Sequence, residues 1–145
     1  MTIVLDFTEI PDGPNTRQHW APKAKAMSER ELQSAVNEML TANGWRWTHF
    51  RTAQLPKGDY ATALDGNKGF PDVVAVRNGR LLFAELKAHR GKPSSEQEEW
   101  LWDLWGCGSE VDSESPWTSQ PGEVPETYVW KPSDLLDGTI ARTLA

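Results

Sequence analysis

The sequence has little of what stabilises secreted or membrane proteins. Its 145 residues include one cysteine, Cys107, which excludes an internal disulfide framework and a cysteine-rich zinc site. No apolar run approaches the roughly 20 residues of a membrane span, and the start lacks the charged and apolar regions of a secretory signal. These absences predict a soluble, cytoplasmic protein without a membrane partner, and the length is that of a single domain.

Positive charge is absent from one part of the chain. Residues 93–126 carry nine acidic side chains and no Lys or Arg, whereas residues 20–92 carry 12 Lys and Arg against 7 Asp and Glu. The net charge of −6 therefore hides a basic half behind an acidic one, and such asymmetry is more informative about partners than the total charge. The acidic block is typical of solvated helices and loops.

Hydrophobic periodicity predicts the order helix, strand, strand, strand, helix, strand, helix. Residues 1–26 are expected to be an N-terminal arm, 27–145 one folded domain, and 109–126 an acidic surface loop within it. The long segment 53–69 is rich in turn residues and is expected to be a loop. The expected helices begin near Ser28, Ser94 and Pro132, and the expected strands are 45–52, 73–76, 81–87 and 127–130, with both central strands buried.

Asn78-Gly79 lies between the two central strands and is among the strongest sequence signals for a two-residue hairpin turn. If these are the loop residues, the two numbers of every opposed pair add to 157, which sets Asp72 opposite Glu85. Opposed residues project to the same side with Cβ atoms about 4.5–5.5 Å apart, and Lys87 follows on that side.

Two carboxylates held so close repel each other unless one is protonated or a cation lies between them. A hard divalent ion such as Mg²⁺ prefers oxygen ligands, usually one or two carboxylates completed by water and substrate phosphate. Lys87 would then hold a phosphate oxygen, orient an attacking water or steady transition-state charge. The register therefore favours a metal site over a structural ion pair between Glu85 and Lys87.

Two further polar residues have alternative interpretations. Glu31 and Gln97 each stand at the fourth position of a capping box, after Ser28 and Ser94 respectively. Both also lie on the inward row of their helix, from which they would point toward the sheet. Spacing alone leaves the choice between cap and site residue open.

Basic residues near this end of the hairpin are candidates for phosphate contacts, although each would be unremarkable as a solvated surface charge. Trp102 lies off the inward face of its helix and is the best candidate for a contact surface or dimer interface. His49 is a candidate contact or proton carrier, against the alternative of a structural histidine. The candidate nucleic-acid-binding residues are Arg51, Lys57, Lys68, Arg90, Lys92 and His49.

The stretches GFPDVVAVRNGRLLFAELK, RGKPSSEQEEWL and YVWKPSDL resemble the VRR-type nucleases of the PD-(D/E)XK superfamily, phage-type proteins similar to Holliday junction resolvases. The resemblance covers roughly residues 28–144 and includes the order of elements. It implies an α/β fold: a restriction-endonuclease-like αβββαβ core with a mixed central sheet flanked by helices, plus a C-terminal helix. The N-terminal arm and the acidic loop are departures from the family pattern.

The resemblance also implies roles for residues. Asp72, Glu85 and the main-chain oxygen of Leu86 would bind Mg²⁺ or Mn²⁺, and Lys87 would be the catalytic lysine. Glu31 matches the acidic residue of the family's first helix, a further metal ligand, and Gln97 matches a supporting active-site glutamine.

The function implied is a metal-dependent endonuclease that hydrolyses DNA phosphodiester bonds, structure-specific in the manner of a Holliday junction resolvase. Its partner would be branched or duplex DNA, and a homodimer is expected by analogy. The alternatives are a flap or nicking nuclease, a non-catalytic DNA-binding module with the same fold, and a protein-interaction module that uses the acidic loop and an exposed Trp.

Overall fold

A computed structural model describes residues 22–50, 53–54, 60–61, 65–107 and 125–145. Its described residues group into two compact units that alternate along the chain: those within 1–43, 86–91 and 130–145 form one, and those within 44–85 and 92–129 form the other. The first is called the helical unit below and the second the sheet unit. No helix among the described residues is long and apolar enough to cross a membrane.

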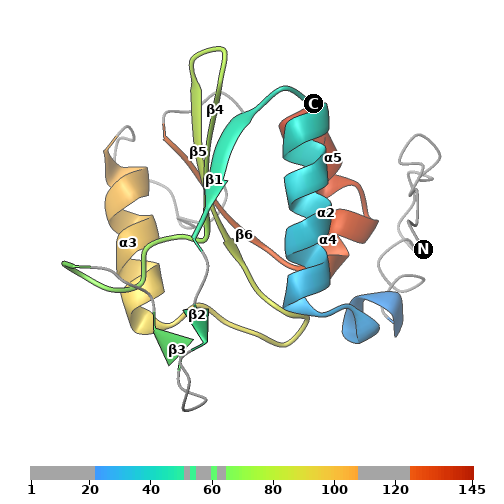
Figure 1. The fold of residues 1–145 in the computed structure, drawn as a ribbon, viewed down its shortest axis with the longest axis horizontal. Helices are drawn as coiled ribbons and strands as arrows, with labels where there is room; N and C mark the ends of the chain where they lie inside the picture. Colours follow the sequence, from blue (N-terminus) through green and yellow to red (C-terminus); the bar gives the residue numbers. More distant parts are fainter. Residues whose placement is uncertain (1–21, 51–52, 55–59, 62–64, 108–124) are drawn as a thin grey trace. The chain divides into compact units, whose positions relative to one another are not determined.

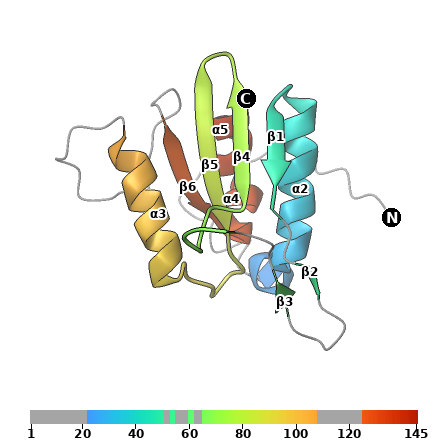
Figure 2. The same ribbon diagram turned by 60° about the vertical axis from the view of Figure 1, so that its left-hand side comes forward.

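The sheet unit contains a four-stranded mixed sheet with the strand order β1-β4-β5-β6, which Figure 2 shows across its width. The strands β1 (Arg46–His49), β4 (Val73–Arg77) and β5 (Arg80–Leu86) pair antiparallel. The parallel neighbour of β5 is β6 (Glu126–Trp130), which returns after helix α3 (Ser95–Gly106). Parallel neighbours need such a crossover, and the α/β class is confirmed.

The hairpin turn has the predicted conformation. Asn78 has φ 47° and Gly79 φ 80°, the two left-handed residues that a type I′ turn requires and that Asn-Gly supplies at low cost. The resulting register pairs Arg77 with Arg80 and Val73 with Ala84. The residue numbers of every β4–β5 pair add to 157, as predicted, so the register inferred from the sequence is confirmed.

One face of β4 is open, contrary to the expectation of a buried strand. Val73 and Ala75 are buried, Val74 is half-buried and Val76 is 42% exposed. A run of four apolar residues shows no alternation in the sequence, so its half-exposure could not be recognised from the pattern.

The turn-rich segment 53–69 is not wholly irregular. Strands β2 (Ala53–Gln54) and β3 (Tyr60–Ala61) pair antiparallel as a separate two-stranded sheet. Two-residue strands carry no periodicity that sequence analysis could detect.

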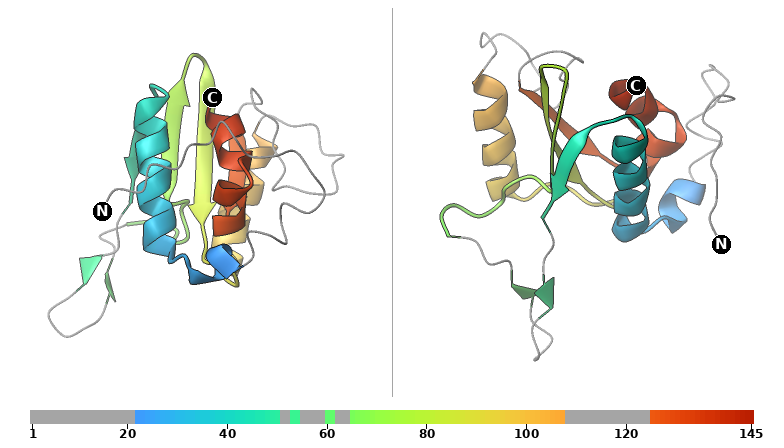
Figure 3. Two further views of the ribbon diagram at one scale, coloured as in Figure 1. Left: turned by 90° about the vertical axis from the view of Figure 1, so that its right-hand side faces the viewer. Right: turned by 45° about the horizontal axis from the view of Figure 1, so that its top comes forward.

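The helical unit is built from α2 (Glu29–Ala42), α4 (Pro132–Leu136) and α5 (Thr139–Leu144). Helix α2 contacts both α4 and α5, as Figure 3 shows, and buries Leu32, Val36 and Leu40. The expected single C-terminal helix is wrong, because Gly138 adopts a left-handed φ of 81° that ends α4 and starts α5. Residues 22–26, assigned to the arm, are helical with Ala24 buried, and residues 1–21 lie outside the described part.

Candidate active site

The end of the hairpin remote from the turn carries the two carboxylates. The β4–β5 ladder ends at Val73 and Ala84, and the same register continued by one residue sets Asp72 opposite Glu85. The Phe50 N–H donates to the Asp72 carbonyl at 3.0 Å, so the chain at Asp72 still runs beside the end of β1. Glu85 is 1% exposed and Asp72 is half-buried. A buried anion of this kind needs compensation by hydrogen bonds or a cation.

Gln97 caps its helix and also points toward the sheet. Its Oε1 accepts from the Ser94 N–H at 2.8 Å, and its backbone N–H donates to Ser94 Oγ at 3.2 Å, which completes the capping box of α3. Because the Ser94 N–H can only donate, the amide oxygen must face it, which leaves the NH₂ group for another acceptor. That acceptor is Glu85 Oε1, at 2.7 Å. One side chain thus caps α3 and ties its first turn to the end of β5.

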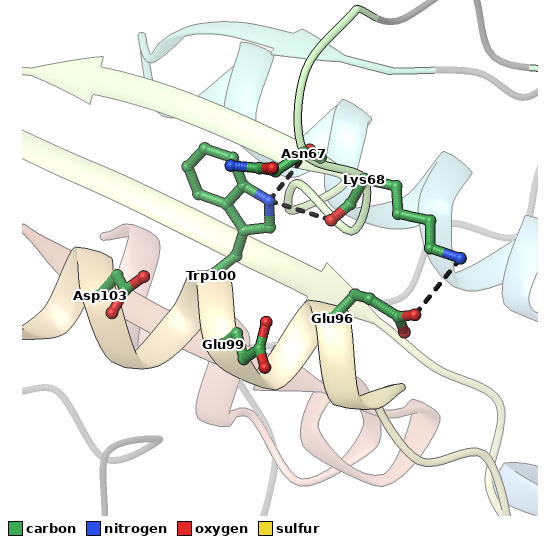
Figure 4. A pocket seen from close by; sticks show the side chains of 6 residues that line it. All are labelled: Asn67, Lys68, Glu96, Glu99, Trp100 and Asp103. Carbon is green, nitrogen blue, oxygen red and sulfur yellow. Dashed lines mark hydrogen bonds and ion pairs between the residues drawn. The ribbon is translucent and has the colours of Figure 1, made fainter.

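The loop that leads to Asp72 packs against α3, the helix that also carries Gln97. Gly69 has φ +97°, and a Cβ at this position would lie 2.6 Å from the main-chain carbon of Glu96 and 2.8 Å from the Gln97 nitrogen. The Trp100 indole N–H donates to the carbonyls of Asn67 and Lys68 at 3.2 and 3.1 Å (Figure 4). Asp72 is therefore approached by a loop that is fixed against the turn of α3 that carries Gln97.

Replacing Gly69 with alanine should lower the free energy of unfolding by about 2–4 kcal/mol, because it adds a strained left-handed residue to a steric clash with helix backbone. Gly66→Ala is the matched control: Gly66 has φ +99°, but no atom lies within 4 Å of its Cβ position, so only strain of about 1–2 kcal/mol applies. Urea denaturation measures both variants. Equal losses would show that the close approach to α3 contributes nothing.

The remaining proposed site residues belong to the helical unit. Leu86 ends β5, and Lys87 follows it, half-buried, with its N–H donating to the Trp130 carbonyl at 2.9 Å. Glu31 is exposed, and its Oε2 accepts from the Ser28 N–H at 3.3 Å. Glu31 is therefore seen in its capping role, and within the described part of the chain no three His, Cys, Asp or Glu side chains gather as metal ligands.

The candidate nucleic-acid-binding residues that the structure describes stand on separate segments of the chain. Arg90 and Lys92 are exposed, while the exposed Lys68 ammonium lies 3.3 Å from Glu96 Oε1. His49 pairs with Val73, which pairs with Ala84, so the pleat turns His49 to the face opposite that of Glu85. Arg51 and Lys57 lie outside the described residues.

A pocket of about 400 Å³ opens beside α3 and is lined by Asn67, Lys68, Glu96, Glu99, Trp100 and Asp103 (Figure 4). Hydrogen bonding by its own backbone N–H, and then the Lys68 ammonium, lower the pKa of Glu96, so this carboxylate stays charged to a lower pH than a free glutamate. The pocket carries three carboxylates and one ammonium group, so its net negative charge repels a phosphate. The pocket is therefore unsuited to a polyanion, and the carboxylate end of the hairpin remains the candidate site.

Sequence analysis missed a second buried carboxylate. Glu126 was placed in the acidic surface loop, yet it begins β6 and is fully buried. It accepts from Arg80 Nε at 2.9 Å and Nη2 at 2.8 Å, and from the Tyr128 hydroxyl at 2.6 Å. The Glu126 hydrogen bond raises the pKa of Arg80, so the guanidinium stays charged. The sequence does carry a signal for this ion pair: the basic Arg80 and the acidic Glu126 stand at the starts of two strands that pair in parallel.

The Trp45 ring lies beside the Arg80–Glu126 ion pair and contacts two arginines. The guanidinium carbons of Arg77 and Arg80 lie 4.7 and 4.8 Å from the centroid of the buried Trp45 ring. Both distances allow cation–π attraction. Because every charge in the group has a partner, we interpret Arg80, Glu126, Tyr128 and Trp45 as a structural cluster.

Comparisons with protein-family models, curated proteins and solved structures found no match to this chain. Asp72 and Glu85 carry carboxylate oxygens at one end of a hairpin. Hard oxygen donors of this kind suit Mg²⁺ or Mn²⁺, which need only one or two protein carboxylates.

Proposed function

We propose that this chain is a Mg²⁺- or Mn²⁺-dependent DNA endonuclease of the VRR type, with the restriction-endonuclease-like core of the PD-(D/E)XK superfamily. The observation that carries the proposal is the hairpin register, which sets Asp72 opposite the buried Glu85 while Gln97 bonds to Glu85. A non-catalytic DNA-binding module gains nothing from opposing a buried carboxylate to a second one, because the pair costs stability without a cation.

Each residue has a distinct role in this proposal. Asp72, Glu85 and the Leu86 carbonyl would hold the divalent ion, which when bound would polarise the phosphate as a Lewis acid and lower the pKa of water. Gln97 is a positioning residue that orients the Glu85 carboxylate through its 2.7 Å hydrogen bond. Lys87 contributes a positive charge two residues after Glu85, which suits a phosphate whose negative charge grows during the reaction.

The proposed substrate is DNA with a particular structure, as for a Holliday junction resolvase, and the proposed assembly is a homodimer with one site per strand. The basic half of the chain supports nucleic acid as the partner despite the net charge of −6. The mixed sheet with the order β1-β4-β5-β6 and a helical crossover supports the core proposed. A flap or nicking nuclease with the same residues is the alternative.

The test is cleavage of a labelled panel containing a four-way junction, a flap, a linear duplex and a single strand, with Mg²⁺, Mn²⁺ or EDTA. We expect cutting with either metal and none with EDTA. A Glu85→Gln preparation purified in parallel controls for a contaminating nuclease. Tight DNA binding without cleavage under any metal would reject the enzyme and favour a binding module.

A further inference from the structure

Phe50 is an exposed aromatic residue next to the candidate site. Its side chain is 39% exposed, and Phe50, Val76 and Trp102 are the exposed large apolar residues of the described part of the chain. The β1–β4 register continued by one residue sets Phe50 beside Asp72, and its N–H donates to the Asp72 carbonyl at 3.0 Å. Of the three exposed residues, Phe50 is therefore the one attached directly to a proposed metal ligand.

The Phe50 ring is held by an aromatic cluster. It meets Phe70 edge to face, with centroids 5.4 Å apart and an interplanar angle of 89°. Phe70 in turn contacts Trp100 at 5.0 Å and Phe83 at 5.9 Å in the same manner. Such contacts favour one ring orientation. A flat surface fixed in this way can receive a ligand ring without a large loss of side-chain entropy.

We propose that Phe50 stacks against an unpaired base next to the phosphate that is cut, an inference that rests on the proposed nuclease function. A base inside a duplex is already stacked on both faces, whereas a base at a flap, a gap or the branch point of a junction has a free face. Stacking on an aromatic side chain contributes about 1–3 kcal/mol per base and tolerates any sequence. The substrate class is thus DNA with an unpaired or unstacked nucleotide at the cleavage point.

A binding experiment tests this without relying on cleavage. A flap carrying 2-aminopurine at the unpaired nucleotide nearest the branch is titrated with protein in EDTA, beside a linear duplex of the same sequence. We expect stacking to quench the probe with wild-type protein. Phe50→Ala should remove the quenching and weaken flap binding roughly 5- to 100-fold, with duplex binding unchanged.

Two variants serve as controls. Phe50→Trp keeps a flat ring and should retain quenching. Val76→Ala removes a 42% exposed apolar side chain near the turn end of β4 and should change neither titration. Thermal melting of each variant shows that it is folded.

The outcomes separate this inference from the nuclease function. Phe50-dependent binding of the flap by a protein that cuts nothing would support the stacking role and reject the enzyme. Cleavage that Phe50→Ala leaves equal on every substrate would support the enzyme and reject the stacking role. The role is also rejected if Phe50→Ala weakens flap and duplex alike, if it changes only the oligomeric state, which would mean that a second copy covers the ring, or if the protein binds no DNA.

Discussion

Replacement of Glu85 by glutamine should reduce kcat/KM for DNA cleavage on the order of 10³-fold and leave the fold intact. Glutamine has the same shape as glutamate. In the wild-type protein the Gln97 amide nitrogen donates to Glu85 Oε1 at 2.7 Å, and the side-chain oxygen of a glutamine at position 85 can accept the same hydrogen bond. The variant loses only the negative charge that a divalent ion needs. Initial rates with a labelled substrate at saturating Mg²⁺ measure the effect.

Thermal melting gives this variant a second, independent readout. Without metal, removal of one of two opposed carboxylates relieves repulsion, so Glu85→Gln should melt at a temperature equal to or higher than wild type. Addition of Mn²⁺ should raise the melting temperature of wild type, which binds it when folded, and not that of the variant. Wild-type activity in Glu85→Gln, or equal stabilisation of both proteins by Mn²⁺, would show that Glu85 is not a metal ligand.

Replacement of Arg80 by methionine should lower the free energy of unfolding by about 3–5 kcal/mol, the cost typical of stranding one partner of a buried ion pair. Glu126 is fully buried and would lose both Arg80 hydrogen bonds, at 2.9 and 2.8 Å. The hydrogen bond from the Tyr128 hydroxyl, at 2.6 Å, would remain. Methionine keeps much of the apolar volume of the arginine stem, so the loss reports on the charge. Urea denaturation measures it.

The double variant Arg80→Met/Glu126→Leu is the matched control. Replacing both members of a buried pair by apolar groups is often nearly neutral, so the double variant should recover most of the stability that Arg80→Met loses. The cleavage rate per folded molecule should remain that of wild type in both. A double variant no more stable than the single one would mean that Arg80 contributes mainly by packing on Trp45.

The features predictable from the sequence are those encoded by neighbouring residues. Asn78-Gly79 specifies a turn that few other dipeptides favour, and from it the register and the opposition of Asp72 to Glu85 follow by counting. The two Ser-x-x-Glu/Gln boxes identified the starts of α2 and α3 in the same way. Such signals act over two to four residues, and tertiary packing does not override them here.

The features that sequence analysis missed depend on residues far apart in the chain. Glu126 looks like one more surface acid until β6 lies beside β5, because its partner Arg80 is 46 residues away. The clash that makes Gly69 necessary involves the backbone of α3 and has no sequence signature. The sequence could not show whether Gln97 caps its helix or points toward the sheet, because the amide group has two ends and the structure uses both.

The two-residue turn also influences the order in which the site is assembled. Contacts between near neighbours close fastest, and a hairpin forms in about 1–10 μs, so Asp72 and Glu85 can meet while water still surrounds both charges. The parallel pairing of β6 must wait for the longer α3 crossover, whose closure costs more chain entropy. We expect the capped start of α3 to dock afterwards and to bring the Gln97 amide to Glu85 as water leaves. In this sequence of events the chain does not carry a bare, desolvated carboxylate through its folding.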